Sequence, residues 1–298
     1  MYLSCLLINV GEDPDRPRPG RLWLRNAYRV HQRLCMAFPT APQREMDPEF
    51  LMPYQPCGFQ DPRPQECSVS AGPAAPARPC AVAAVDRPVH VPRNTEHNFL
   101  FCINPKPGAS PVILVQSAIE PDWDYAFHNA GYLLVAPPQV RSFDPYFSAE
   151  QRLRFRLLAN PVRKVSRNSL DLAGKPFGPQ WIGKDVPVPT EHLRNWLERR
   201  AEPGWSPPKN SEDKQCPPGF RLVDPLHIQP GYVYVNDKRD GGSGRRLRSA
   251  RYDGVLEITD PAGFRNTVIK GIGPGKAFGF GLLSLAPAAT PGESERRP

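Results

Sequence analysis

The stretch that decides the fold is DPAGFRNTVIKGIGPGKAFGFGLLSLAP, residues 260–287. Asp260 followed by Pro261 is typical of the start of a helix. Gly271 is typical of its end, because glycine readily adopts the left-handed conformation that closes helices. Residues 277–286 alternate small and large side chains, which predicts a strand. The stretch therefore predicts a helix, a glycine-rich loop and a terminal strand.

The glycines of this loop raise the question of a phosphate site, and two nucleotide motifs can be excluded. A Walker loop needs Ser or Thr after its Gly-Lys pair, whereas Lys276 is followed by Ala277. The dinucleotide motif needs a glycine where Lys276 stands, and a strand before the loop. Two interpretations remain at this point: the glycines only permit tight packing, or they let the backbone approach phosphates.

The second half of the chain supplies further helix and strand patterns before this stretch. Residues 190–202 form an amphipathic pattern whose apolar side comprises Leu193, Trp196 and Leu197. Strands are expected within 184–189, 219–224, 231–237 and 246–259. Together with the final helix and strand, these elements approximate the order βαββαβ.

The first half repeats the same order. Residues 2–10 predict a strand, and Asn26 is a suitable N-cap for a helix that ends before Pro39, with Val30, Leu34, Ala37 and Phe38 as its core stripe. Two short strands are expected at 98–103 and 111–119, followed by an irregular helical crossover. Residues 151–159 alternate arginine with apolar residues, which is typical of a half-buried strand and predicts the last strand of this unit.

The fold class predicted from these patterns is α+β, with two tandem ferredoxin-like domains of the connectivity found in RNA-recognition modules. The first is expected at 1–162 and carries a Pro-rich insertion at about 41–93. The second is expected at 175–287, with the junction near 160–175 and a disordered tail at 288–298.

The composition favours a polyanionic partner. The 298 residues carry a net charge of +8, and no apolar run has the length of a bilayer span. The seven cysteines have no zinc-finger spacing, and no metal or cofactor motif occurs, so we expect no cofactor. The beginning of the sequence lacks the pattern of a signal peptide, which predicts a cytoplasmic protein without membrane contact.

Tyr28, His31 and Cys35 have the spacing of one helix face. An imidazole one turn from a phenol is a workable acid–base pair near neutral pH, so Tyr28 and His31 are candidate catalytic residues. A histidine at the edge of a buried face is more often structural, and this alternative stays open.

Basic residues gather in three other places. Residues 236–251 join two expected strands and include Arg245, Arg246 and Arg248. Charged residues on a hairpin can serve only to keep its edge solvated. Guanidinium groups suit phosphates and base edges, so we favour a nucleic-acid contact here. Arg163, Lys164 and Lys184 add positive charge near the domain junction. These six residues, with Gly271, Gly273, Gly275 and Lys276, are the candidate RNA-binding residues.

The chain resembles the CRISPR-associated endoribonucleases of type I-E systems, the CasE-type subunits of Cascade within the repeat-associated RNA-binding superfamily. The resemblance is carried by YLSCLLINV at 2–10, YRVHQRL at 28–34, the long stretch at 114–164, and YDGVLEITDPAGFRNTVIKGIGPGKAFGFGLLSLAP at 252–287. It covers nearly the whole chain apart from about 41–93 and the tail.

The resemblance implies cleavage of the CRISPR repeat RNA at the base of its hairpin, with the crRNA product kept in a complex with other Cascade subunits. Tyr28 and His31 match the catalytic pair of the family, the glycine-rich loop matches a segment lying against the RNA backbone, and residues 236–251 match the element that engages the stem. Cys5 and Met36 depart from the family by standing where basic residues are expected, which leaves Lys164 and Lys184 as candidate cations.

Two other functions remain possible from the sequence. One is an RNA-binding scaffold that holds a guide RNA without cutting it, which incubation with hairpin RNA would distinguish from an enzyme. The other is a ferredoxin-like regulator of a small ligand, which the arginine-rich segment at 236–251 disfavours.

Overall fold

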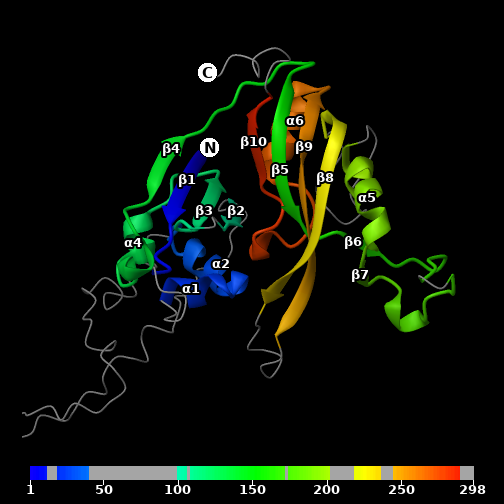
Figure 1. Cartoon of the computed structure of the whole chain (residues 1–298), viewed down its shortest axis with the longest axis horizontal. Helices are drawn as coiled ribbons and strands as arrows, with labels where there is room; N and C mark the ends of the chain where they lie inside the picture. The colour runs from blue at the N-terminus through cyan, green and yellow to red at the C-terminus, as the bar shows by residue number, and fades with distance from the viewer. Residues whose placement is uncertain are drawn as a thin grey trace, which may run out of the picture.

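The structure is a computed structural model that describes residues 1–11, 19–39, 99–105, 108–171, 174–201, 218–235 and 244–288, without the side chain of Arg245. The predicted insertion at 41–93 lies outside the described residues, and so does the predicted tail except for residue 288. The described residues form two four-stranded sheets with helices (Figure 1).

The first sheet has the strand order β2-β3-β1-β4 with antiparallel neighbours. Its unit consists of β1 (Tyr2–Leu7), α1 (Pro19–Leu24), α2 (Ala27–Cys35), β2 (Phe99–Asn104), β3 (Val112–Ser117), α4 (Trp123–Phe127), the short helix η4 (Gly131–Leu133) and β4 (Gln139–Ser142). The predicted strands at 2–10, 98–103 and 111–119 are thereby confirmed.

Helix α2 forms where the sequence predicts it. The side-chain oxygen of Asn26 accepts hydrogen bonds from the backbone N–H groups of Tyr28 and Arg29 at 3.1 and 3.4 Å, which satisfies donors that a helix start leaves unpaired. The helix ends at Cys35. The predicted core stripe is confirmed by the burial of Val30, Leu34, Ala37 and Phe38.

The second sheet has the strand order β10-β5-β9-β8, again antiparallel throughout. Its unit consists of β5 (Arg152–Ala159), α5 (Leu193–Ala201), β8 (Phe220–Val235), β9 (Arg245–Ile258), α6 (Pro261–Lys270) and β10 (Leu283–Pro287). Short helices η5 (Pro179–Trp181), η6 (Thr190–His192) and η8 (Lys276–Phe278) lie between them. The strand patterns predicted at 219–224 and 231–237 fall on the single long strand β8 as far as Val235, and residues 236 and 237 lie outside the described residues.

The assignment of residues 151–159 to the first unit is wrong. This strand, β5, pairs with β9 and β10 in the second sheet. Its predicted alternation is confirmed, since Leu153, Phe155 and Leu157 are buried. Alternation reports which face is buried and carries no information about the partner strand. The first sheet is completed by β4, whose four residues are all exposed and therefore show no alternation.

The strand expected at 184–189 also has a different partner from the predicted one. Here β7 (Asp185–Pro187) pairs with β6 (Val162–Lys164) in a separate two-stranded sheet. The segment between β4 and β5 passes from one unit to the other along the upper edge of Figure 1.

Helix α6, the loop after it and β10 are the helix, loop and strand predicted from residues 260–287. The carboxylate of Asp260 accepts from the N–H of Ala262 at 3.0 Å, and Gly271 closes the helix with φ 71°. The strand predicted at 277–286 is shorter than expected, because Gly279 (φ 81°) and Gly281 (φ 93°) have left-handed backbone that a strand does not accommodate. Only Leu283–Pro287 pair with β5.

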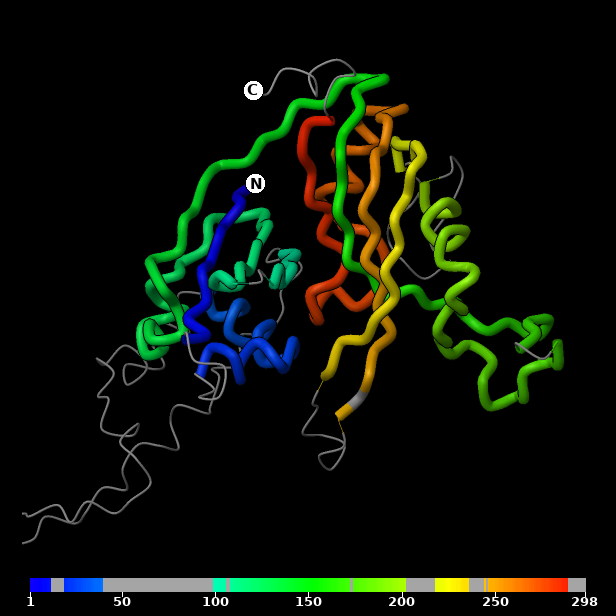
Figure 2. The backbone as a smooth tube through the Cα atoms, viewed as in Figure 1, coloured from blue at the N-terminus to red at the C-terminus, as the bar shows by residue number. Residues whose placement is uncertain are grey.

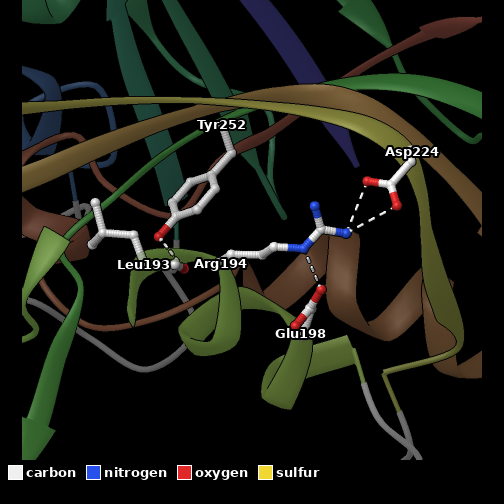
Figure 3. A network of polar contacts seen from close by, with 5 residues as sticks. All are labelled: Leu193, Arg194, Glu198, Asp224 and Tyr252. Atoms are coloured by element: carbon white, nitrogen blue, oxygen red, sulfur yellow. Dashed lines mark hydrogen bonds and ion pairs between the residues drawn. The ribbon is translucent and has the colours of Figure 1, made fainter. Parts of the chain in front are cut away.

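Polar contacts fasten α5 to the second sheet (Figure 3). Tyr252 on β9 donates its hydroxyl hydrogen to the carbonyl of Leu193 at 3.0 Å. Arg194 donates to both carboxylate oxygens of Asp224 on β8, at 2.8 and 3.0 Å, and to Glu198 at 2.7 Å. The predicted apolar side of the helix, Leu193, Trp196 and Leu197, is buried beneath these contacts.

The two units pack directly against each other. The side-chain amide of Gln116 on β3 donates to the carbonyl of Val268 on α6 at 2.8 Å, and this hydrogen bond is buried. Leu100 and Cys102 of β2 form a buried apolar cluster with Leu282, which precedes β10. The glycine-rich loop therefore lies where the units meet.

Candidate functional site

The side chains predicted to share one face of α2 do lie together. The ring centroids of Tyr28 and His31 are 6.4 Å apart, and the sulfur of Cys35 is 3.5 Å from Nε2 of His31. Tyr28 is partly exposed, whereas His31 is only 8% exposed.

Aromatic rings from β2 enclose His31. Its ring is 5.4 Å from that of Phe99 and is stacked on that of Phe101 at 6.3 Å, with 13° between the planes. These neighbours could not be predicted from the sequence, because they lie far from α2 along the chain and no local pattern indicates the contact. The enclosure fits the structural role left open for His31, whose side chain is almost fully buried.

The glycine-rich loop reaches this helix from the other end of the chain. Its short helix η8 packs against α2, and the ring of Phe278 is 6.3 Å from that of Tyr28. Gly279 approaches β2 so closely that an added Cβ atom would lie 3.2 Å from the Phe101 ring. Figure 2 shows the red end of the chain beside the blue N-terminal unit. Tyr28, His31 and the segment containing Lys276 are thus brought together.

The three predicted RNA-binding glycines have packing reasons of their own. Gly271, Gly273 and Gly275 have φ values of 71°, 84° and 81°, which strain any other residue. An added Cβ atom would lie 2.7 Å from the carbonyl oxygen of Gly281, 3.0 Å from the ring of Trp196 and 2.9 Å from the ring of Phe280, respectively. The packing interpretation therefore holds for these positions, and their contact with RNA stays a prediction. The side chain of Lys276 is partly exposed.

The predicted arginines lie on the long β8–β9 hairpin, whose strand β8 also contacts α2. Arg246 is exposed and donates from Nε to the hydroxyl of Tyr234 at 2.6 Å. Arg248 is partly exposed and donates to the hydroxyl of Thr190. Arg245 is the first residue of β9.

The remaining basic residues lie elsewhere. Arg163 and Lys164 are on β6, and Lys184 directly precedes β7. Arg163 donates to the carbonyl of Leu170 at 2.6 Å, and Lys184 Nζ is 5.6 Å from the centre of the Trp181 ring. Figure 1 places β6 and β7 on the opposite side of the second sheet from α2. The structure therefore does not bring Lys164 or Lys184 to Tyr28 and His31 as cations for that site.

The two departures from the family pattern occupy different environments. Met36 is fully buried in the core of the first unit, so a charge at this position would lie among apolar side chains. Cys5 is partly buried on β1, where it pairs with Leu114 and Gln139 of the neighbouring strands.

The described part of the chain lacks two features. No group of three or more His, Cys, Asp and Glu residues there is arranged to hold a metal ion. No helix there is long and apolar enough to cross a membrane.

Comparison with known proteins agrees with these features. A family model described as CRISPR associated protein matches residues 83–287. The CRISPR-associated endoribonuclease Cse3 of Thermus thermophilus is 35% identical over 199 residues, which are 63% of this chain and 80% of Cse3. The CRISPR system Cascade subunit CasE of Escherichia coli is 33% identical over 136 residues, 45% of this chain and 58% of CasE.

A solved structure of one of these relatives has a similar fold. Thermus thermophilus Cse3 bound to an RNA representing a pre-cleavage complex superposes with a TM-score of 0.58 at 26% identity, covering 96% of this chain and 98% of that one. The family model spans more than half of the chain, and the resemblance stated from the sequence is confirmed. The chain belongs to the CRISPR-associated protein family and, within it, to the endoribonuclease type of Cse3 and CasE.

Proposed function

We propose that the protein binds the hairpin of CRISPR repeat RNA in the cytoplasm, cleaves the precursor at the base of the stem and keeps the crRNA as a subunit of Cascade. Its relatives support each part. Cse3 is named an endoribonuclease and has been solved with RNA as a pre-cleavage complex, and CasE is named a Cascade subunit.

We infer that each sheet with its helices is a ferredoxin-like domain. Both units run βαββαβ, and both sheets place the fourth strand beside the first, then the third and the second. On this basis the first domain ends at about Ser142 with β4, and the second extends from about Arg152 to Pro287. These limits replace the earlier boundary near 160–175, and the connectivity is the one RNA-recognition modules use.

The single observation that carries the proposal is the meeting of three distant segments. Helix α2 brings Tyr28 and His31, the glycine-rich loop brings η8 with Lys276, and the arginine-bearing hairpin contacts the same helix through β8. Side chains that can transfer protons therefore lie near side chains that can bind phosphate, at the junction of the two units. An RNA stem held by the hairpin could present the nucleotide at its base to α2.

The reaction needs only alignment, proton transfer and charge stabilisation. The 2′-hydroxyl of the nucleotide before the scissile bond attacks the adjacent phosphorus, and the bond to the 5′-oxygen of the next nucleotide breaks. One proton leaves the 2′-oxygen and one reaches the 5′-oxygen, giving a 2′,3′-cyclic phosphate, which water can open to a 3′-phosphate. We assign one of these transfers to His31 and the orientation of the 2′-hydroxyl to Tyr28.

The cation for this site is best supplied by Lys276. It lies in η8, which packs against α2, whereas Lys164 and Lys184 lie across the second sheet. The transferred phosphate gains negative charge in the transition state, and a positioned ammonium stabilises that charge more than it stabilises the substrate.

Binding of the stem is assigned to the hairpin and the loop. Arg245, Arg246 and Arg248 start β9 at the free end of the hairpin, and their guanidinium groups suit phosphate oxygens. Arg163, Lys164 and Lys184 would extend this binding surface over β6 and β7, away from the cleavage site.

Single-turnover cleavage of repeat hairpin RNA by His31 variants tests the proposal. We expect His31→Ala to lower the rate on the order of 10²–10⁴-fold and to leave hairpin affinity nearly unchanged, because phosphate contacts elsewhere carry affinity. His31→Asn, a smaller polar replacement, and measured melting temperatures separate lost chemistry from lost packing.

Three outcomes are decisive. Slow cleavage by a stable, RNA-binding His31→Asn variant supports the proposal, and partial recovery with added imidazole strengthens it. Normal cleavage by that variant would leave His31 with the structural role. If the wild-type chain binds the hairpin and never shortens it, the protein is a non-catalytic scaffold.

A further inference from the structure

The free end of the β8–β9 hairpin carries two tyrosines that the proposed mechanism does not use, beside two of the arginines that it assigns to the RNA stem. In the strand register Tyr232 is opposite Arg248, and Tyr234 is opposite Arg246. Opposite residues and residues two apart share one face of a sheet, so all four side chains lie on the same face. Tyr232, Tyr234, Arg246 and Arg248 are called the tyrosine–arginine cluster below.

The cluster continues the face that carries the core of the second unit. Further along β9, Ala250 and Tyr252 on this face are fully buried, and Tyr252 reaches the backbone of α5. The helical layer ends at Thr190, whose hydroxyl accepts a hydrogen bond from Arg248. Beyond that point the hairpin projects past β5 and β10 (Figure 1). The helical layer therefore ends where the cluster begins.

The two tyrosines are exposed in a way that folding does not require. Tyr232 is 60% exposed and Tyr234 is 53% exposed, although both alternate with partly or fully buried valines on the same strand. Exposed aromatic side chains grouped on one face mark interaction sites more often than isolated ones do.

Arg246 holds the cluster in a defined arrangement. Its Nε donates to the hydroxyl of Tyr234 at 2.6 Å, and its guanidinium carbon is 5.1 Å from the centre of that ring and 5.8 Å from the Tyr232 ring. The guanidinium group thus fixes Tyr234 by its polar end while much of the aromatic side chain stays accessible. Such fixed groups lose little conformational entropy when a ligand binds.

We infer that the tyrosine–arginine cluster is a stacking site for an unpaired nucleobase of the bound RNA. Bases stack on tyrosine rings and on guanidinium planes. Within a paired stem the base faces are covered by their neighbours, and the major groove is too deep and narrow for side chains to read. The tyrosines therefore select an unpaired nucleotide next to the stem, while Arg246 and Arg248 bind the neighbouring phosphates.

Charge favours RNA over a protein partner at this place. Within the described ranges neither Arg246 nor Arg248 pairs with a carboxylate, so both remain suited to phosphate groups next to the stacked base. The inference rests on the proposed function and adds that the substrate has an unpaired nucleotide beside the stem.

The test compares two RNAs with the full chain. One is the repeat RNA that the wild-type protein cleaves, with its unpaired flanks, and the other is the same stem as a blunt duplex. We expect Tyr232→Ala combined with Tyr234→Ala to weaken binding of the flanked RNA by about 5- to 150-fold. Binding of the blunt duplex should not change. Replacing both tyrosines with Phe should preserve binding, because the ring remains.

Two further measurements make the test specific. Tyr146 is 88% exposed in the segment between β4 and β5, so Tyr146→Ala is a matched control and should bind both RNAs as the wild type does. RNA carrying 2-aminopurine at successive unpaired positions should lose fluorescence on binding the wild type, at one position or more. That quenching should be absent with the double alanine variant.

Three results would overturn the inference. Equal weakening on the flanked RNA and the duplex would place the cluster on the stem, and weakening by the double Phe variant would exclude stacking. Unchanged binding of both RNAs, with loss of association to other Cascade subunits, would make the cluster a protein contact. Failure of the wild type to cleave repeat RNA would instead refute the proposed function, irrespective of the tyrosines.

Discussion

At the scale of single residues, Lys276 lies in η8, which packs against α2, and is the cation that we propose for the site. We expect Lys276→Met to lower the single-turnover cleavage rate on the order of 10²-fold, because the developing charge on the phosphate loses a positioned partner. Lys175, an exposed lysine in the segment between β6 and β7, supplies the matched control, and Lys175→Met should cleave normally. Equal rates for the two variants would show that the cation comes from another residue.

Gly271 has the strictest steric requirement at the junction of the units. Its φ is 71°, and an added Cβ atom would lie 2.7 Å from the carbonyl oxygen of Gly281 and 2.8 Å from the side chain of Leu100. We expect Gly271→Ala to lower the free energy of unfolding by about 1–3 kcal/mol in denaturant titrations. Gly174→Ala is the control, since its φ is 75° and nothing lies within 4 Å. Equal losses in both variants would mean that the close packing contributes nothing.

Local spacing predicts only part of the environment of each residue. The periodicity of a helix was sufficient to group Tyr28, His31 and Cys35, and the structure confirms that grouping. The rings of Phe99 and Phe101 around His31 come from β2, so only the tertiary fold brings them into contact. For the same reason Lys164 and Lys184 were candidate cations in the sequence, although β6 and β7 lie away from α2.

At the scale of elements, Glu257 joins three strands of the second sheet. On β9 it accepts hydrogen bonds from Arg221 of β8 and, at 3.0 Å, from Arg152 of β5. The hydrogen bonds from Arg221 and then Arg152 hold the pKa of this carboxyl below its usual range. A lowered pKa in the folded chain means stabilisation above the pKa of the unfolded chain, which is lost as the pH falls through the folded value.

We therefore expect Glu257→Gln to melt at a lower temperature than the wild type at neutral pH. The difference should shrink as the pH falls through the lowered pKa of Glu257, because the wild-type carboxyl then becomes neutral too. Thermal unfolding monitored by circular dichroism at several pH values measures this, with Glu120→Gln as a control at an exposed carboxylate. A difference that stays constant with pH would assign the effect to packing.

Caps and burial patterns predict elements better than they predict pairing. Asn26 and Asp260 cap α2 and α6 as expected, since a cap is a contact between near neighbours in the chain. The alternation in β5 identified its buried face and not its sheet, which depends on β9 and β10 far along the sequence. The left-handed glycines of the terminal loop shorten β10 in a way that alternation of large and small side chains does not reveal.

At the scale of the whole molecule, the proposed function depends on how the two units meet. The buried hydrogen bond from Gln116 to Val268 and the cluster around Leu100 fix the glycine-rich loop against β2 and α2. Two units of the same strand order could be predicted from the sequence, because each repeats the same succession of local patterns. The point of division between them could not, because it depends on which sheet takes up β5.

The central claim is that the substrate's own 2′-hydroxyl is the nucleophile and that this chain aligns it, moves protons and stabilises the developing charge. The most direct measurement is single-turnover cleavage of repeat hairpin RNA beside the same RNA with one 2′-deoxy nucleotide before the scissile bond, both in EDTA. We predict normal cleavage of the first RNA and none of the second, with equal binding of both. Cleavage of the deoxy substrate, or loss of cleavage in EDTA alone, would contradict the account and identify an activated water as the nucleophile.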